Sequence, residues 1–197
     1  MTNRVEPLPR EDLAEFEDGL VMIEALMGFV PTSMHAMARV PGLVPAFLAL
    51  GNAAMANGLL PAGLPHMLSH VVSYGAGCRY CQAHTAHTAE RNGLAPEKVA
   101  ELWNFERSEL FDDAERAALR IAFHAGQSPN AVTDDDFERA REFYDDAQLA
   151  AIVAAASFFG YLNRWNDTVA TGLEAEPSAF GAERLGAAGW DPGKHTD

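Results

Sequence analysis

Apolar residues recur at the three- and four-residue spacing of an amphipathic helix along almost the whole chain. Near the N-terminus they stand at Leu13, Phe16, Leu20, Ile23 and Leu26, on one face of a helix. No segment shows the alternation of apolar and polar residues that is typical of a strand. The pattern therefore predicts an all-α fold.

Glycines, prolines and capping residues mark the ends of the expected helices. Asp112 and Thr133 each precede a helical pattern and can accept a hydrogen bond from a first turn. Pro65 can open a helix, because it lacks an N–H that a first turn leaves unpaired. We expect helices over about 13–26, 33–38, 43–57, 65–75, 96–103 and 147–169, others after 112 and 133, and one that carries the cysteines and ends near 92. The Ala-rich segments favour close helix packing, and hence a tight bundle.

The last 26 residues differ in composition from the rest of the chain. Residues 172–197 combine Gly, Pro, Ala and charged residues with the isolated aromatics Phe180 and Trp190. We therefore divide the chain into an all-helical domain, residues 1–171, and a C-terminal arm or tail, residues 172–197. The segment is either mobile or laid on a neighbouring subunit, and the two aromatics favour the second.

The charge balance excludes some classes of partner. The chain has 14 Lys and Arg against 28 Asp and Glu, a net charge of −14, which repels phosphate backbones and anionic lipids. We therefore expect no nucleic-acid and no membrane binding. The N-terminus lacks an apolar signal core, and residues 147–160 are too short to span a bilayer. We expect a cytoplasmic protein.

The two cysteines, Cys78 and Cys81, are the residues that most clearly indicate chemistry. A Gly-Ala-Gly turn at 75–77 precedes them and places them at the start of a helix. Unpaired N–H groups and the helix dipole favour thiolate there, so we expect a lowered pKa for at least one cysteine. Residues three apart on a helix are neighbours, so the pair can form a disulfide. These properties favour a redox centre.

Histidines flank the cysteine pair on both sides. His84 follows Cys81 by three residues and can reach the same helix face, where it can carry a proton. His66 and His70 share a face of the preceding helix. Two cysteines and two histidines also permit a zinc site, which is the main alternative. Ligands spaced three apart on one helix drift around it, however, so we expect neither a metal nor another cofactor.

Three segments resemble the carboxymuconolactone decarboxylase superfamily, in particular its alkylhydroperoxidase D-like branch. They are Gly-Cys-Arg-Tyr-Cys at 77–81 continuing to Gly-Leu-Ala-Pro-Glu at 93–97, Phe-Asp-Asp-Ala-Glu-Arg-Ala-Ala-Leu at 111–119, and Phe-Phe-Gly-Tyr-Leu-Asn-Arg-Trp-Asn-Asp at 158–167. Together they cover about residues 40–170, in the order of the family.

The resemblance implies an oligomeric all-helical protein that reduces hydroperoxides. In that branch the second cysteine attacks the peroxide oxygen and becomes a sulfenic acid, and the first condenses with it to a disulfide. This implies Cys81 as the peroxidatic and Cys78 as the resolving residue, with a dithiol or redox protein as reductant. His84 and His66 are the expected proton carriers, and Asn163 or Asn166 would form a polar wall.

Two positions depart from the family pattern and keep other functions open. The family's glutamate twelve residues before the first cysteine is here His66, and its histidine four residues after the second cysteine is Thr85. A relay of His66, water and His84 remains chemically feasible, but the departures point to another oxidant or a changed reaction. The alternatives are a decarboxylase, against which the cysteine pair argues, a Cys/His metal protein, and a non-catalytic assembly protein.

Overall fold

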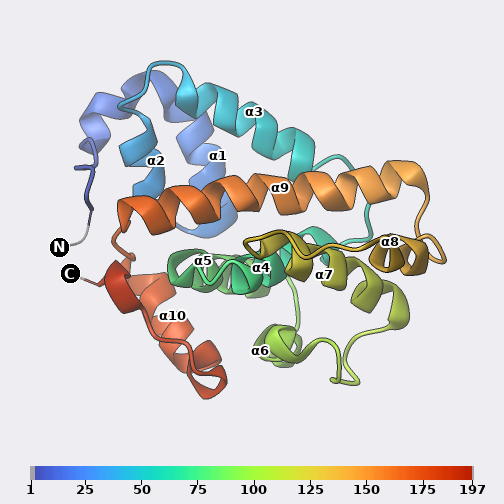
Figure 1. Ribbon diagram of the computed structural model, residues 1–197. Coiled ribbons are helices and arrows are strands. Elements are labelled where there is room, and N and C mark those ends of the chain that lie inside the picture. Colours follow the sequence, from blue (N-terminus) through green and yellow to red (C-terminus); the bar gives the residue numbers. More distant parts are fainter. Residues whose placement is uncertain (1–2, 197) are drawn as a thin grey trace.

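The computed structural model describes residues 3–196. Within that range the chain forms α-helices, short 3-10 turns and no strand, which confirms the predicted all-α fold (Figure 1). The helices are α1 (Glu17–Met27), α2 (Thr32–Met37), α3 (Leu43–Met55), α4 (Leu64–Gly75), α5 (Arg79–Arg91), α6 (Pro96–Ala100), α7 (Asp113–Gly126), α8 (Asp134–Ala140), α9 (Asp146–Val169) and α10 (Ala175–Leu185). None of those described helices is long and apolar enough to cross a lipid bilayer.

Local sequence explains where the later helices begin. Asp112, Thr133 and Asp145 are the N-cap residues of α7, α8 and α9, and each forms a capping box with the residue three positions on. The N-terminal helix differs from its expected form. Residues Arg10–Phe16 are a 3-10 helix, and α-helical geometry starts only at Glu17.

Helix α4 lies at the centre, packed against α5, α7 and α9. Its buried residues include Leu68, Val71 and Val72, which contact Leu119 of α7 and Ile152 of α9 in one apolar cluster. Burial of apolar surface stabilises such a cluster by about 25 cal/mol per Å². This rigid centre holds the start of α5 in place.

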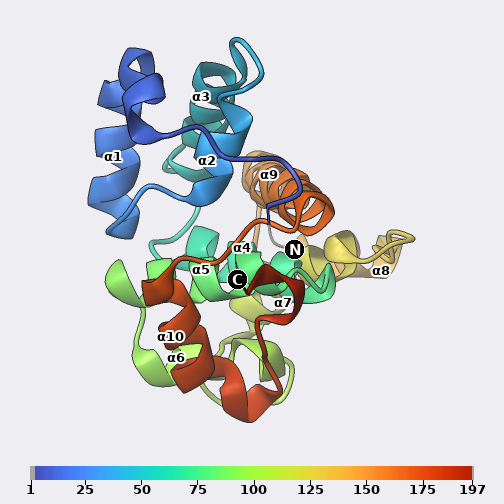
Figure 2. The same cartoon turned by 90° about the vertical axis from the view of Figure 1, so that its left-hand side faces the viewer.

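Helices α1, α2 and α3 form a second layer on the opposite side of α9 (Figures 1 and 2). Leu20, Met37 and Phe47 are buried there, and the Phe47 ring stacks on Phe158 of α9 with ring centroids 4.9 Å apart. Helix α9 is therefore shared by the two layers.

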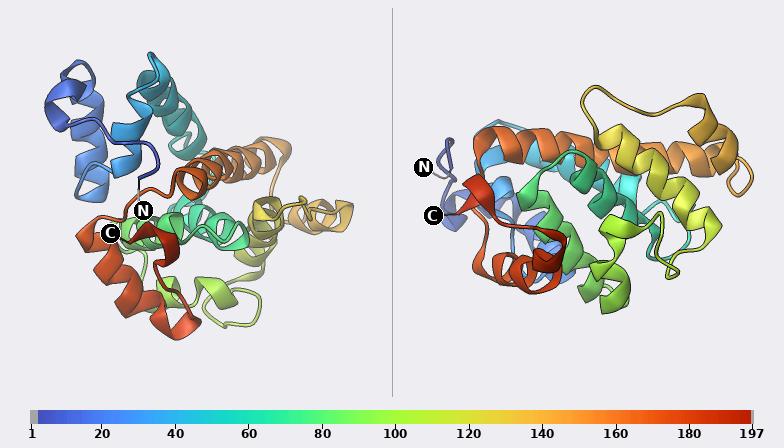
Figure 3. Two further views of the ribbon diagram at one scale, coloured as in Figure 1. Left: turned by 60° about the vertical axis from the view of Figure 1, so that its left-hand side comes forward. Right: turned by 60° about the horizontal axis from the view of Figure 1, so that its bottom comes forward.

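The C-terminal segment folds back on its own chain. Helix α10 packs on α5, and the Trp190 indole N–H donates to the Arg79 carbonyl, 3.1 Å away. The chain then continues through a 3-10 turn at Gly193–His195, and the Leu173 N–H donates to the His195 carbonyl. The first and last described residues lie on the same side of the molecule (Figure 3). We call residues 172–196 the C-terminal arm.

Candidate active site

The turn before α5 places both cysteines. Gly77 has a positive φ of 71°, a conformation that glycine adopts without strain. Cys78 is then the N-cap residue of α5, and Cys81 is the third residue of the helix. Both are buried free thiols, with exposed fractions of 0% and 3%.

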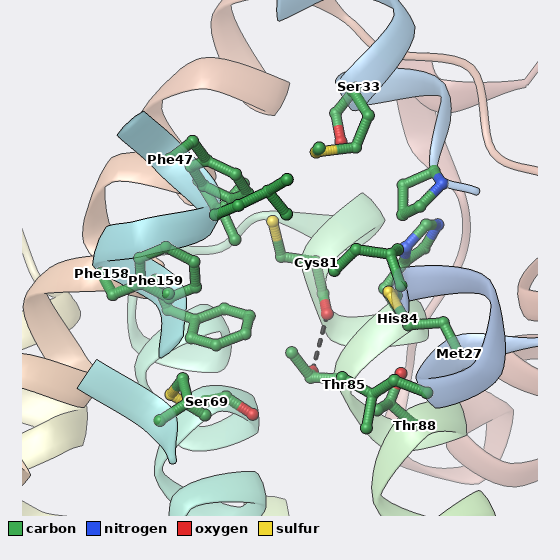
Figure 4. A pocket seen from close by; sticks show the side chains of 18 of the residues that line it. Met27, Ser33, Phe47, Ser69, Cys81, His84, Thr85, Thr88, Phe158 and Phe159 are labelled. Atoms are coloured by element: carbon green, nitrogen blue, oxygen red, sulfur yellow. Dashed lines mark hydrogen bonds between the residues drawn. The ribbon is translucent and has the colours of Figure 1, made fainter. Parts of the chain in front are cut away.

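Cys81 faces a cavity of about 380 Å³ between the two layers. Figure 4 shows its side chain directed into this space, with Phe47, Phe158 and Phe159 on one side and Met27 and His84 on the other. The remaining lining is mostly apolar and comes from α1, α2, α3 and α9, with further residues from α4 and α5. A cavity of this kind suits a small apolar ligand. Cys78 is not part of the lining.

Burial raises the pKa of Cys81 well above its ordinary value, and the neighbouring Cys78 thiol raises it further. The expectation of a lowered pKa is therefore wrong for Cys81, because desolvation outweighs the helix N-terminus. Asn166 opposes this effect: its side-chain N–H donates to the Cys81 sulfur, 3.5 Å away. The Thr171 hydroxyl donates to the Asn166 carbonyl oxygen and fixes the amide in this orientation. Asn166 thus forms the polar wall, whereas Asn163 is buried with no hydrogen-bond partner among the described residues.

His84 pairs with a carboxylate that the sequence analysis did not identify. Its Nε2 lies 2.6 Å from Glu174, the residue before α10. Glu174 also accepts hydrogen bonds from the Tyr80 hydroxyl at 3.1 Å and from the Thr32 N–H at 2.5 Å. Burial favours a raised pKa for Glu174, but the His84 charge and the hydrogen bonds from His84 and from the Thr32 N–H lower it to about 2. A glutamate–histidine pair is thus present at positions other than those of the family pattern, with its carboxylate supplied by the C-terminal arm.

His66 lines the same cavity as Cys81 and His84, so the structure brings these three predicted residues together. Burial lowers the pKa of His66, which favours its neutral form. Thr85, which stands where the family has histidine, donates to the Cys81 carbonyl at 2.6 Å. Its hydroxyl also lies 3.1 Å from Nδ1 of His70, a buried residue whose desolvation lowers its pKa to about 4.

The zinc site considered from the sequence does not form. Among residues 3–196, the group of potential metal ligands that comes together does not combine the two cysteines with His66 and His70. It consists of Cys78, Asp167 and His195, whose ligand atoms lie within 4.8 Å of one another.

Comparison with known proteins gives consistent matches. The Carboxymuconolactone decarboxylase family matches residues 41–123. The debrominase Bmp8 is 32% identical, with a TM-score of 0.85 over 89% of this chain and 95% of that one. Its cysteine-to-alanine variant in complex with 2,3,4-tribromopyrrole gives a TM-score of 0.88 over 93% and 98%.

Two further matches are more distant. A peroxidase-related protein from Ralstonia eutropha JMP134, described as an alkylhydroperoxidase AhpD core, is 25% identical, with a TM-score of 0.72 over 90% of this chain and 92% of that one. The uncharacterized protein YdfG of Bacillus subtilis is 27% identical over 96 residues, which are 48% of this chain and 63% of that protein.

Proposed function

Because the chain belongs to the carboxymuconolactone decarboxylase superfamily, in its alkylhydroperoxidase D-like branch, we propose that it is a thiol-dependent reductase that acts through Cys81 and Cys78. The observation that carries the proposal is a buried cysteine at an apolar cavity, with a second free cysteine beside it. Two thiols supply the two electrons of one reduction, and their product is a disulfide.

The substrate class that fits the site best is a small halogenated aromatic compound. The lining of Phe, Met and Leu side chains matches such a ring, and a charged or strongly polar ligand would leave its polar groups unpaired there. The similarity to the debrominase over nearly the full length of both chains supports the same class.

The reaction divides into two balanced steps. The Cys81 thiol gives its proton to His84 and its sulfur attacks the halogen; the carbon–halogen bond breaks, and its electron pair remains on the ring carbon, which takes up a proton. The Cys78 thiol then loses its proton and attacks the Cys81 sulfur, a disulfide forms, and halide leaves. We assign the proton donor to protonated His84, which lines the cavity and which Glu174 holds and stabilises.

Bromide release from 2,3,4-tribromopyrrole in the presence of dithiothreitol tests this proposal. We expect one bromide and one debrominated product for each dithiol oxidised. Cys81→Ser should abolish turnover, and Cys78→Ser, assayed without dithiothreitol, should allow at most one release per chain. Absence of bromide release from the wild-type protein would exclude this substrate class.

Hydroperoxide reduction is the second candidate, and the Glu174–His84 pair favours it as an acid–base pair beside the nucleophile. Here Cys81 attacks the terminal peroxide oxygen, the O–O bond breaks, and the alcohol leaves with a proton. Cys78 then displaces water from the Cys81 sulfenic acid. Cumene hydroperoxide consumption, measured beside bromide release with the same variants, decides between the two substrates.

A further inference from the structure

The arm brings a second histidine to the cysteine pair, on the side of Cys78 rather than of the cavity. His195 is 1% exposed. One nitrogen of its ring, the Cys78 sulfur and a carboxylate oxygen of Asp167 all lie within 4.8 Å of one another. The mechanism described above makes no use of this histidine.

Hydrogen bonding determines which ring nitrogen of His195 carries the proton. Its Nδ1 lies 2.8 Å from the Thr171 carbonyl oxygen, and a carbonyl only accepts hydrogen bonds, so Nδ1 is the donor. In the neutral ring Nε2 is therefore the lone-pair nitrogen. Within the described residues, this buried Nε2 has no hydrogen-bond partner.

Asp167 supplies the charge that a protonated His195 needs. Its carboxylate oxygen lies 3.9 Å from the His195 Nε2 and 2.8 Å from the Lys194 ammonium. The carboxylate favours the imidazolium form, whereas the ammonium opposes it. Burial lowers the pKa of His195 and keeps the ring neutral before the reaction. A neutral base beside a thiol, with a carboxylate nearby that stabilises the base once it is protonated, is the arrangement that general-base catalysis requires.

We propose that His195 is the general base for the resolving step: its Nε2 accepts the proton of Cys78 as the Cys78 sulfur attacks the oxidised Cys81 sulfur. The proton moves to His195, the new S–S bond forms, and the group bound to Cys81 leaves with the electron pair of the broken bond. The positive end of α5 stabilises the developing charge on Cys78, its N-cap residue. This inference rests on the proposed function of the two cysteines.

The same three residues do not make a good cation site. The Lys194 ammonium lies 2.8 Å from the carboxylate that would bind the ion, and the N-terminal end of α5 repels positive charge. Both features favour proton transfer. Metal binding remains an outcome that the experiment can detect.

The small aromatic disulfide 2,2′-dithiodipyridine separates the two thiol steps. Attack by Cys81 releases one pyridine-2-thione and leaves a mixed disulfide, and attack by Cys78 on that disulfide releases the second. Stopped-flow absorbance therefore resolves two phases in the wild-type protein. Cys78→Ser should show the first phase alone.

The variant His195→Asn retains an N–H where Nδ1 stands, so it can still donate to the Thr171 carbonyl, but it lacks the base at Nε2. We expect its first phase to be unchanged and its second phase to be at least tenfold slower. His35→Asn is the matched control, because His35 makes the same kind of Nδ1 contact to the Leu8 carbonyl, also at 2.8 Å. That control should leave both phases unchanged.

The pH dependence distinguishes a base from a merely structural role. In the described part of the chain, five ionisable groups face His195. They are Cys78 at the N-cap of α5, Tyr80 and His84 within α5, Asp167 of α9, and Lys194, which precedes His195 in the chain. In His195→Asn, the second phase should accelerate as the pH rises, because Cys78 then has no neighbouring base and must lose its proton to water. In the wild-type protein the dependence should be much weaker.

The possible outcomes separate the role of His195 from the proposed function of the two cysteines. Equal second phases in the wild-type protein and in His195→Asn would overturn the role of His195. Release of only one pyridine-2-thione by the wild-type protein would instead contradict the proposed function itself. One zinc per chain in the purified protein, lost in His195→Asn, would overturn the base in favour of a metal site. A thermal melt of each variant checks that it is folded.

Discussion

Cys81 combines two properties that oppose each other. Its burial among aromatic and methionine side chains suits an apolar substrate, but the same burial raises its pKa and disfavours the thiolate. Among the described residues, the side-chain N–H of Asn166 donates a hydrogen bond to the Cys81 sulfur. As the proposed nucleophile, Cys81 is therefore expected to be selective rather than broadly reactive, since its attack needs both a fitting substrate and a proton acceptor.

Glu174→Gln should lower turnover about 10- to 100-fold while the protein stays folded. Glutamine can still accept hydrogen bonds from Tyr80 and Thr32, but it carries no charge to stabilise a protonated His84. Steady-state kinetics on the preferred substrate measures the effect. Glu176→Gln is the control on the same arm, because Glu176 bonds His87 and its side chain is 59% exposed. Equal losses in both variants would indicate a role in arm docking instead.

His70 should make the protein less stable in mild acid. The unfolded chain binds this proton near pH 6.5, whereas the folded chain binds it only near pH 4. The unfolded state therefore gains protons first, and stability falls by roughly 3 kcal/mol as the pH drops from above 6.5 to below 4.

His70→Asn retains a donor for the Thr85 hydroxyl but does not titrate. Its free energy of unfolding, measured in urea at several pH values, should therefore fall less between pH 6.5 and 4.5 than that of the wild-type protein. Parallel curves would show that His70 does not titrate as described.

Distance along the chain decides which of these residues the sequence could predict. Cys78, Cys81, His66 and His84 lie within one pair of adjacent helices, where helical spacing indicates which side chains share a face. Glu174 lies 90 residues from His84, and spacing rules do not extend beyond one helix. The only sequence signal for it was the acidic character of the segment that contains it.

At the scale of the helices, the pairing of α4 with α7 fixes the position of the turn that carries the cysteines. A Cβ added at Gly75 would meet the Phe123 carbonyl oxygen, and one added at Gly126 would meet the Val72 carbonyl oxygen. The two helix ends therefore approach each other closely because both residues are glycine.

Gly126→Ala should destabilise the protein by about 1–3 kcal/mol, because backbone would have to move to make room.

Gly160→Ala is the opposite case. Gly160 lies inside α9 with open space around it, so alanine there should stabilise the fold by up to about 1 kcal/mol. Urea unfolding of both variants shows whether each change lowers or raises the free energy of unfolding. A stable Gly126→Ala protein would show that the contact can relax.

Helix boundaries were predictable where a side chain defines them. The capping side chains of Asp112 and Thr133 start α7 and α8 at the expected places. The 3-10 form of Arg10–Phe16 was not predictable, because the spacing of three between Leu13 and Phe16 fits a 3-10 helix as well as an α-helix.

At the scale of the whole molecule, the C-terminal arm contributes a residue on each side of the cysteine pair. Glu174 at its start supports the cavity side, and His195 near its end lies at Cys78. Composition alone could not place this segment, since Phe180 and Trp190 would be buried equally well on this chain or on a neighbour. The oligomeric state implied by the family resemblance stays a prediction.

Trp190→Ala should loosen the arm and expose Cys78. Trp190 is 6% exposed, packs over Gly181 and donates to the Arg79 carbonyl. Loss of a buried tryptophan costs about 3–5 kcal/mol. Alkylation of Cys78 by iodoacetamide, followed by mass spectrometry, should be at least tenfold faster than in the wild-type protein. Trp103→Ala, at a 43% exposed residue, should not change it.

The burial of both sulfurs also constrains how the protein returns to its starting state. Substrate reaches Cys81 through the cavity, and a small dithiol can follow the same route. A protein reductant must instead press its own cysteine against the disulfide, and the arm stands over the Cys78 side. With a protein reductant, we therefore expect reduction of the disulfide to be limited by how often the C-terminal arm detaches, so the segment that brings Glu174 and His195 to the two cysteines would also limit the rate of the proposed cycle.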